Sequence, residues 1–387
     1  MKRWRVAFIA MVGLNLTSVP GDSVLAEATK APAAVISPEV HADHSITFRI
    51  RAPGAHSLLF KLEGQNTTTN MDKDAEGVWS ITTAPLTPDY YGYSFFMDDV
   101  MLIDPSSPQI KPSLITAQSE AYVVGPEPAP WDITDVAHGE VHHHFYHSAI
   151  TNDDRDYYVY TPPGYNSGSK RTYPVLYLLH GFSDGANAWT AIGRANVVLD
   201  NLIAQHKVKP MIVVMPLGYG DMDIVRHGWE PQSDELRERN IAGFRKALST
   251  EIMPRVEHQY KINGQRTSHA IAGVSMGGAQ SLLNGLNNLD KFAWVGAFSS
   301  GIIPGDFDHA FPMLDSSANQ RLKLLWIACG IEDNFITHNR DLRTWLQAKD
   351  VHLTAIETPG GHTWLVWRRN LIEFLPLLFQ PSAALKH

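Results

Sequence analysis

The sequence predicts an α/β fold preceded by a small β-sandwich. Three observations predict it. From Tyr173 onward, short apolar strands alternate with helical stretches, which indicates a mostly parallel sheet. Residues 35–125 instead contain short strands of alternating polarity separated by polar turns. Residues 269–279, HAIAGVSMGGA, read as a buried strand, a tight turn and the start of a helix. A chain of 387 residues is also long enough for two domains.

The first 26 residues have the pattern of a signal peptide. Lys2, Arg3 and Arg5 precede a short apolar run over residues 6–16, and small residues follow at 24–26. The run is too short for a membrane-spanning helix, and we expect no membrane anchor. We therefore expect an exported protein, periplasmic or extracellular. Cleavage would remove three positive charges and one negative charge, changing the net charge from −8 to −10.

Residues 27–34 are expected to form a loose leader, and residues 35–125 the sandwich. Its strands are expected at residues 45–51, 57–62, 77–82 and 91–97. Trp79, Tyr91 and Tyr93 could form a platform for sugar rings or the core of the sandwich. We favour the core, because large aromatic side chains dominate the cores of small domains.

Residues 126–138 are expected to link the sandwich to an α/β domain over residues 139–381. The segment GPEPAPW at 125–131 is rich in proline, which makes a stiff linker. We expect the two parts to fold separately. The strands of the second domain are expected at residues 155–161, 175–179, 211–215, 269–274, 294–298, 323–329 and 353–358. Its main helices are expected at 195–205, 239–260, 339–349 and 365–379, with breaks or bends at Pro254 and Pro376.

Composition and charge exclude several classes of function. The net charge is −8 and no block of Lys and Arg stands out after the N-terminus, so nucleic acid is not an expected partner. The single cysteine, Cys329, lies in an apolar run and is expected to be a buried strand residue. His142, His143 and His144 lack partners at metal-ligand spacing, so we predict no metal site and no cofactor.

Gly273-Val274-Ser275-Met276-Gly277 matches G-x-S-x-G, the nucleophile elbow of the α/β-hydrolase fold. The serine must occupy a strained turn between strand and helix so that its hydroxyl projects from the backbone. Side chains two residues before and after it would collide, which explains the glycines. We predict that Ser275 is a nucleophile.

A serine nucleophile needs a base and an acid, which follow it in that order in this fold. His362 is the candidate base, because it lies in a glycine-rich loop after the last expected strand. Asp333 is the candidate acid, in the loop after residues 323–329, and Glu332 is its rival. The oxyanion hole needs two backbone N–H groups, which we assign to Met276 and Phe182.

Five segments carry a resemblance to a known family: YLLHGFSDGANAW, GVSMGGAQSL, KFAWVGAFSSG, IACGIEDNF and PGGHTWLVWR. Over residues 140–380 the chain resembles carbohydrate esterase family 1, which contains feruloyl and acetylxylan esterases. It is similar, more distantly, to enterochelin esterases and mycolyltransferases. The resemblance places Ser275, Asp333 and His362 at the triad positions and favours Asp333 over Glu332. Residues 35–125 resemble early-set, immunoglobulin-like modules, some of which bind sugar polymers.

The resemblance implies a serine carboxylesterase that works through an acyl-enzyme. We expect hydroxycinnamoyl esters of plant cell-wall polysaccharide, or small aryl esters, as substrates. Aromatic residues in the loops near the triad are expected to contact the phenolic ring: Trp189, Tyr219, Trp229 and Trp364. Packing beneath their own loops is the alternative for these side chains. Alternative functions are an acetylxylan esterase, a siderophore esterase, a sugar acyltransferase and a non-catalytic binding module.

Overall fold

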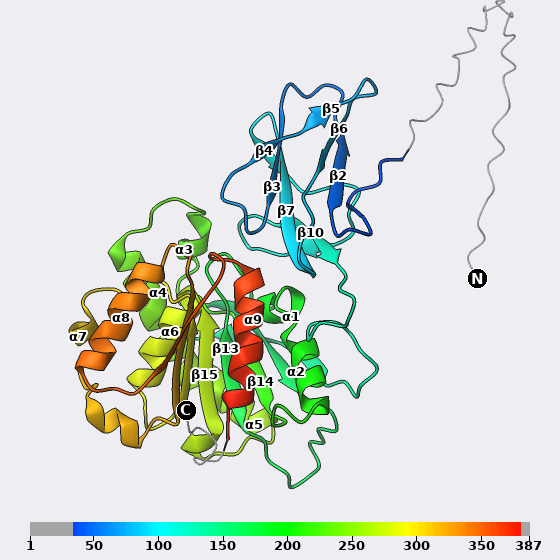
Figure 1. The fold of residues 1–387 in the computed structure, drawn as a ribbon. Coiled ribbons are helices and arrows are strands. Elements are labelled where there is room, and N and C mark those ends of the chain that lie inside the picture. Colours follow the sequence, from blue (N-terminus) through cyan, green and yellow to red (C-terminus); the bar gives the residue numbers. More distant parts are fainter. Residues whose placement is uncertain (1–33, 381–387) are drawn as a thin grey trace, which may run out of the picture. The chain divides into compact units, whose positions relative to one another are not determined.

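The computed structural model describes residues 34–380, and the predicted signal peptide lies outside this range. Within this range, the residues from Val35 onward form one compact unit, which contains a β-sandwich and an α/β domain (Figure 1). No helix in the described range is long and apolar enough to cross a membrane.

The sandwich consists of two antiparallel sheets. Their strand orders are β1-β2-β6-β5 and β4-β3-β7-β10-β9, with β8 paired to β7. The bounds are β1 (Glu39–Val40), β2 (Ile46–Arg51), β3 (Leu58–Leu62), β4 (Thr69–Asn70), β5 (Asp72–Lys73), β6 (Val78–Thr82), β7 (Asp89–Met97), β8 (Val100–Leu102), β9 (Ile110–Lys111) and β10 (Gln118–Val123). The early-set, immunoglobulin-like topology stays a prediction.

Aromatic side chains fill the sandwich core. Trp79, Tyr91 and Tyr93 are all buried there, and Trp79 Nε1 donates to the carbonyl of Ala52. Their prediction as core residues is confirmed. Leu365 of the α/β domain belongs to the same apolar cluster, so the core of the sandwich is completed by a residue from the C-terminal part of the chain.

The α/β domain is built on one mixed sheet with the order β11-β12-β14-β13-β15-β16-β17-β18. The strands from β13 to β18 are parallel, and β11 and β12 are antiparallel at one edge. The bounds are β11 (Glu140–Ser148), β12 (Asp153–Thr161), β13 (Val175–Leu179), β14 (Ile212–Pro216), β15 (His269–Val274), β16 (Trp294–Phe298), β17 (Leu324–Gly330) and β18 (Thr354–Thr358). This is the mixed sheet of the α/β-hydrolase type predicted from the sequence.

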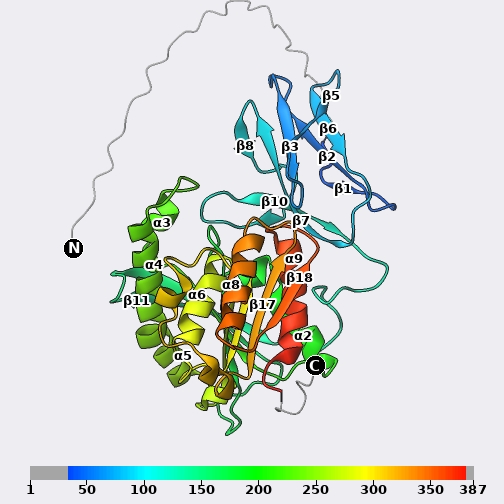
Figure 2. The same cartoon turned by 60° about the vertical axis from the view of Figure 1, so that its left-hand side comes forward.

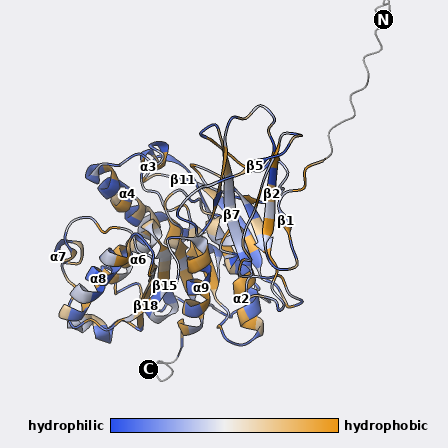
Figure 3. Cartoon of the chain, turned by 45° about the horizontal axis from the view of Figure 1, so that its top comes forward, coloured by the Kyte–Doolittle hydropathy of each residue, from blue (hydrophilic) through white to orange (hydrophobic). Residues whose placement is uncertain are grey.

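Helices cover both faces of this sheet (Figures 1 and 2). One face packs on α1 (Ala188–Ala191), α2 (Ala195–Ala204) and α9 (Trp364–Phe374). The other packs on α4 (Asp234–Ala247), α5 (Met253–Gln259), α6 (Met276–Leu286) and α8 (Ile336–Ala348). The short helices α3 (Asp223–Arg226) and α7 (Phe307–Ala310) lie in loops. Apolar colouring gathers around β15, whereas α4 and α8 carry hydrophilic outer faces (Figure 3).

The long helix expected at residues 239–260 starts earlier than predicted, and it is interrupted close to Pro254, as predicted. Helix α4 begins earlier because the Ser233 side chain accepts the N–H of Leu236 as an N-cap. The interruption is a π-helical turn at Leu248–Ile252, which directly precedes Met253 and Pro254 of α5. Because proline has no N–H, it leaves a carbonyl of the preceding turn without its helical donor. The C-terminal helix ends at Phe374, and Pro376 lies in the following 3₁₀ turn.

Charged residues join the sandwich to the α/β domain. Asp89 at the start of β7 is completely buried and forms ion pairs with Arg368 and Arg369 of α9. Arg368 is itself completely buried and also donates to the carbonyl of Ile192. β7 lies against α9 in both ribbon views (Figures 1 and 2). The two parts therefore share a buried polar interface as well as a linker.

Candidate active site

Ser275 occupies the tight turn between β15 and α6. Its backbone has φ 77° and ψ −108°, a strained conformation for a residue with a side chain. A Cβ on Gly273 would lie 2.5 Å from the carbonyl oxygen of Gly277, and a Cβ on Gly277 would lie 2.5 Å from that of His180. The two glycines are therefore required by close approach of the backbone, as the sequence predicts.

Ser275, His362 and Asp333 form a continuous hydrogen-bonded chain. The Oγ of Ser275 lies 2.9 Å from Nε2 of His362, and Nδ1 of His362 lies 2.9 Å and 3.1 Å from the two oxygens of Asp333. Because a carboxylate only accepts, Nδ1 carries the proton and Nε2 is free to accept the serine proton. This is the geometry of a serine hydrolase triad.

Asp333 is placed to remain ionised. Burial opposes its ionisation, but hydrogen bonds from His362 and from the N–H of Phe335 hold its pKa below the usual value. The rival acid, Glu332, has an exposed side chain. The loops that carry the acid and the base are packed together, since a Cβ on Gly330 would lie 2.1 Å from the carbonyl oxygen of Gly360.

The two N–H groups assigned to the oxyanion hole are available. Met276 is the first residue of α6, so its N–H has no acceptor within the helix. In the described part of the chain, neither this group nor the N–H of Phe182 donates to another protein group. Both groups are therefore free to donate to a ligand, and their role as the oxyanion hole stays a prediction.

His180 holds the loop that carries Phe182. Its Nε2 accepts the N–H of Gly218 at 2.8 Å, so its Nδ1 carries a proton and donates to the carbonyl of Gly181 at 2.8 Å. Burial lowers its pKa to about 4, which keeps the imidazole neutral. His180 directly follows β13, and no role was predicted for it from the sequence.

The sandwich also contacts both catalytic loops. The loop between β9 and β10 reaches the oxyanion loop, where the N–H of Leu114 (2.7 Å) and the hydroxyl of Ser113 (3.0 Å) donate to the carbonyl of Ser183. Ser183 has a positive φ of 72°. Glu63, the residue directly after β3, accepts the N–H of Trp364 at 2.9 Å, and Trp364 lies two residues after His362. These residues were not predicted from the sequence.

Glu63 is fixed by further partners. Its second oxygen accepts from the N–H of Gly92 at 2.9 Å and from Nζ of Lys111 at 2.8 Å. Burial opposes its ionisation, but the ammonium of Lys111 lowers the pKa of Glu63 below the usual value. The carboxylate is thus a charged link between two sandwich strands and the N-terminus of α9.

Two of the four aromatic residues expected to bind substrate are placed elsewhere. Trp189 is completely buried in the core of the α/β domain, where its Nε1 donates to the carbonyl of Leu179. Tyr219 is also buried, and its hydroxyl donates to the carbonyl of Asp184. Neither lines the cavities beside Ser275, because each aromatic ring packs beneath its own loop. The expectation for these two residues is corrected.

The other two aromatic residues line a cavity of about 520 Å³ that contains Ser275 and His362. Trp229 is two-thirds exposed, packs edge-on against Phe182 and donates to the hydroxyl of Thr116 in the sandwich. Trp364 is largely buried but contributes to the wall. Among the described residues, no group of three or more His, Cys, Asp or Glu side chains is placed to hold a metal ion.

A family model identifies the protein family of this chain. The Esterase family model, described as "Putative esterase", matches residues 148–378, more than half of the chain. The chain belongs to the Esterase family. It is therefore an esterase, and its relatives include enzymes named as feruloyl or ferulic acid esterases.

This esterase is similar to curated enzymes with named activities. The "Endo-1,4-beta-xylanase/feruloyl esterase" of Xylanibacter ruminicola is 28% identical over 356 residues, which cover 89% of the esterase chain and 46% of that relative. The esterase thus spans less than half the length of this relative. The "Acetyl esterase" of Caldicellulosiruptor saccharolyticus is 25% identical over 230 residues, which cover 51% of the chain and 80% of that enzyme.

Solved structures share the fold of this esterase. The CE1 ferulic acid esterase from Anaeromyces mucronatus has a TM-score of 0.56 at 25% identity, covering 65% of the chain and 96% of that structure. The enterobactin esterase from Shigella flexneri has a TM-score of 0.65 at 20% identity, covering 87% of the chain and 93% of that structure. The second match shows a shared fold that extends beyond the α/β domain.

Proposed function

We propose that this esterase is an exported serine carboxylesterase that releases hydroxycinnamic acids, such as ferulic acid, from plant cell-wall polysaccharide. The observation that carries the serine mechanism is the hydrogen-bonded chain from Ser275 through His362 to Asp333, which opens into a cavity. The printed activities of the Xylanibacter and Anaeromyces relatives support the feruloyl substrate. Export rests on the signal-peptide pattern of residues 1–26.

In the proposed reaction, Ser275 Oγ attacks the ester carbonyl while His362 Nε2 takes its proton. The tetrahedral oxyanion is stabilised by the N–H groups of Met276 and Phe182. Collapse of the intermediate breaks the ester bond, and His362 gives the proton to the departing alcohol. Water, activated by the same imidazole, then releases the acid from the acyl-enzyme. Asp333 stabilises the imidazolium in both steps.

The test combines covalent labelling with a substrate panel. A fluorophosphonate should label Ser275 stoichiometrically, and mass spectrometry of the labelled peptide should place the adduct on that residue. The panel compares kcat/KM for methyl ferulate, feruloylated arabinose-xylose fragments, acetylated xylan and an aryl acetate. We expect the feruloyl esters to be hydrolysed most efficiently. Higher efficiency on both acetyl substrates would overturn the hydroxycinnamoyl proposal but not the serine mechanism.

A catecholate siderophore is the second candidate substrate. The fold shared with the enterobactin esterase covers most of both chains. Hydrolysis of enterobactin at a higher kcat/KM than any feruloyl ester would support this alternative. Product formation without an added alcohol acceptor separates hydrolysis from acyl transfer to a sugar.

A further inference from the structure

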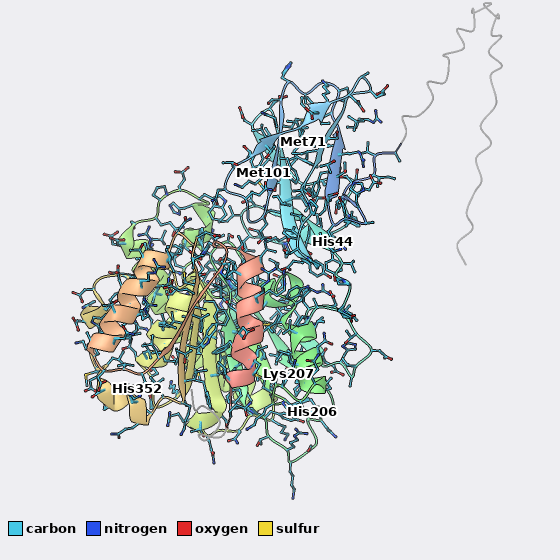
Figure 4. The ribbon with its side chains drawn as sticks, viewed as in Figure 1. His44, Met71, Met101, His206, Lys207 and His352 are labelled. Atoms are coloured by element: carbon cyan, nitrogen blue, oxygen red, sulfur yellow. The ribbon has the colours of Figure 1, made fainter. Side chains whose placement is uncertain are left out.

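Ser275 lies where two cavities meet. The larger one, of about 520 Å³, extends to the sandwich, and Met101, labelled in Figure 4, contributes to its wall from β8. The smaller one, of about 240 Å³, lies beside α4 and α6. Ser275, Phe182 and Phe335 line both cavities. A substrate attacked by Ser275 can therefore extend into both at once, with one part of the ester in each.

The position of His362 determines which part of the ester enters which cavity. In the proposed reaction the imidazole gives its proton to the departing alcohol oxygen, so the alcohol must leave on the side of His362. His362 lines the larger cavity. Among the described residues that line the smaller cavity, Met276 is present and His362 is not. The acyl group, which stays bound to Ser275 after the alcohol departs, is then directed toward the smaller cavity.

The chemistry of the linings agrees with this assignment. The larger cavity has aromatic walls, on which sugar rings can stack, and polar side chains of the sandwich that can bond to sugar hydroxyls: Lys61, Thr116 and Gln118. The smaller cavity is walled mainly by apolar side chains that suit a flat ring: Ile224, Ile241, Ala279, Ile302, Pro304 and Phe335. Its volume is near the lower end of small-molecule sites, about 300 Å³, which suits one substituted ring better than an oligosaccharide.

We propose that the smaller cavity is the acyl pocket, which holds the aromatic ring of the substrate, so that Trp229 and Trp364 in the larger cavity face the sugar and not the phenolic ring expected from the sequence. The larger cavity is then the alcohol site, in which the sugar is bound jointly by the α/β domain and by sandwich residues including Lys61 and Gln118. This assignment rests on the proposed function, because it uses the direction of proton transfer from His362. It makes Ile241 and Ile302 determinants of acyl specificity, and Gln118 a determinant of alcohol specificity.

The test fills each cavity separately. Ile241→Trp on α4 narrows the smaller cavity, and Gln118→Trp on β10 narrows the larger one. For Ile241→Trp, kcat/KM on methyl ferulate should fall at least about tenfold, and kcat/KM on methyl acetate should change less than about threefold. For Gln118→Trp, methyl ferulate should be nearly unaffected, and the feruloylated arabinose-xylose fragment should lose at least about tenfold.

A second pair of variants guards against misfolding. Ile302→Trp alters a largely exposed residue of the smaller cavity and should reproduce the effect of Ile241→Trp. Lys61→Trp alters the larger cavity and should reproduce the effect of Gln118→Trp. Unchanged circular dichroism and melting temperature show that the fold is intact. The reverse pattern, in which Gln118→Trp impairs methyl ferulate and Ile241→Trp impairs only the sugar ester, would overturn the assignment.

The same variants distinguish failure of the assignment from failure of the proposed function. If the unaltered protein hydrolyses no feruloyl ester, the proposed substrate is wrong. The cavities are then probed with 4-nitrophenyl esters that differ only in the acyl group, from acetate to octanoate. Selective loss of the longer esters in Ile241→Trp would still support the acyl pocket. Equal loss across the series would overturn it.

Discussion

At the scale of single residues, the active site depends on a turn whose backbone conformation is fixed by hydrogen bonds. The strained turn at Ser275 is held by the N–H of the same residue, which donates to Phe298, and by its carbonyl, which accepts from Ala279 and Gly301. The surrounding hydrogen bonds over-determine the turn, so the hydroxyl stays in line with His362. Replacement of the hydroxyl alone should remove the chemistry without disturbing the turn.

Ser275→Ala should lower kcat for an aryl acetate on the order of 10⁴-fold or more, because no other group forms the acyl-enzyme. Alanine keeps the Cβ, so the melting temperature should stay close to that of the unaltered protein. Steady-state hydrolysis and thermal unfolding measure the two quantities. A well-folded Ser275→Ala protein with substantial activity would contradict the assigned nucleophile.

Asp184 is a buried carboxyl group on the oxyanion loop that the proposed reaction does not use. A Cβ on Gly181 would lie 3.5 Å from an oxygen of Asp184 and 3.4 Å from the Cβ of Ser275, so the carboxyl lies near the nucleophile. Burial raises its pKa to about 7. Between about pH 4 and pH 7 the unfolded chain loses this proton while the folded protein keeps it. The free energy of unfolding therefore falls as the pH rises through this range.

Asp184→Asn should remove this loss, making the variant more stable than the unaltered protein at pH 8 by up to about 4 kcal/mol. Near pH 4 the two proteins should differ much less, because the carboxyl is then neutral in the folded protein and still about half protonated in the unfolded chain. Urea unfolding at both pH values measures the difference. Asp290→Asn, at an exposed position, is the control. An equal shift at pH 4 and pH 8 would contradict the ionisation argument.

At the scale of elements, three loops meet at the site, and the sandwich holds two of them. Ser113 and Leu114 fix Ser183 in the oxyanion loop, and Glu63 fixes the N–H of Trp364 beside the His362 loop. Small displacements of catalytic groups are costly, since about 1 Å can reduce a rate about 10²-fold. Glu63 is therefore a positioning residue that acts on His362 through the start of α9.

Glu63→Ala should lower kcat about tenfold to a hundredfold on a small aryl acetate, with little change in KM, because it moves His362 rather than a binding wall. Glu63→Gln should recover part of kcat, because its amide oxygen can accept the N–H of Trp364, although Lys111 loses its counter-charge. Glu76→Gln, in an exposed turn of the sandwich, is the control. A rise in KM with unchanged kcat would contradict positioning.

The triad could be predicted from the sequence because each member carries a local signal. Ser275 lies in a motif with required glycines, and Asp333 and His362 each follow a strand in the order this fold demands. The aromatic residues carried no such signal: Trp189 in α1 and Trp364 at the start of α9 both follow loops of the site, but only packing determines which of them reaches a cavity. Glu63 could not be found, since 301 residues separate it from Trp364.

At the scale of the whole molecule, we expect the stability of the α/β domain to depend on its buried interface with the sandwich. The sequence predicts separately folding parts joined by a proline-rich linker. The structure instead buries Asp89 against Arg368 and Arg369, and inserts Leu365 into the sandwich core. Removing one partner of a buried ion pair costs about 3–5 kcal/mol, because the other charge is left without compensation. The α/β domain alone would carry that penalty in addition to the loss of Glu63.

A shortened chain that begins at Gly139 should therefore be insoluble, or soluble with less than about a hundredth of the activity on an aryl acetate. Expression of the shortened and the full chains side by side, with solubility, circular dichroism and kcat measured, checks this outcome. Adding Arg368→Met to the shortened chain should improve its solubility without restoring kcat, because Glu63 is still missing. A soluble shortened chain with full activity would show that the sandwich is dispensable.

The buried pair between Asp89 and Arg368 also bears on how such proteins can diverge by recombination. A gene rearrangement that exchanges or deletes the sandwich would leave the Arg368 guanidinium buried without a carboxylate, a defect that a single crossover cannot repair. We therefore expect the sandwich to be inherited together with α9 and not exchanged as an independent module. We expect esterases of this family that lack a sandwich to carry an uncharged residue at the position of Arg368, a difference that can be read from a gene sequence.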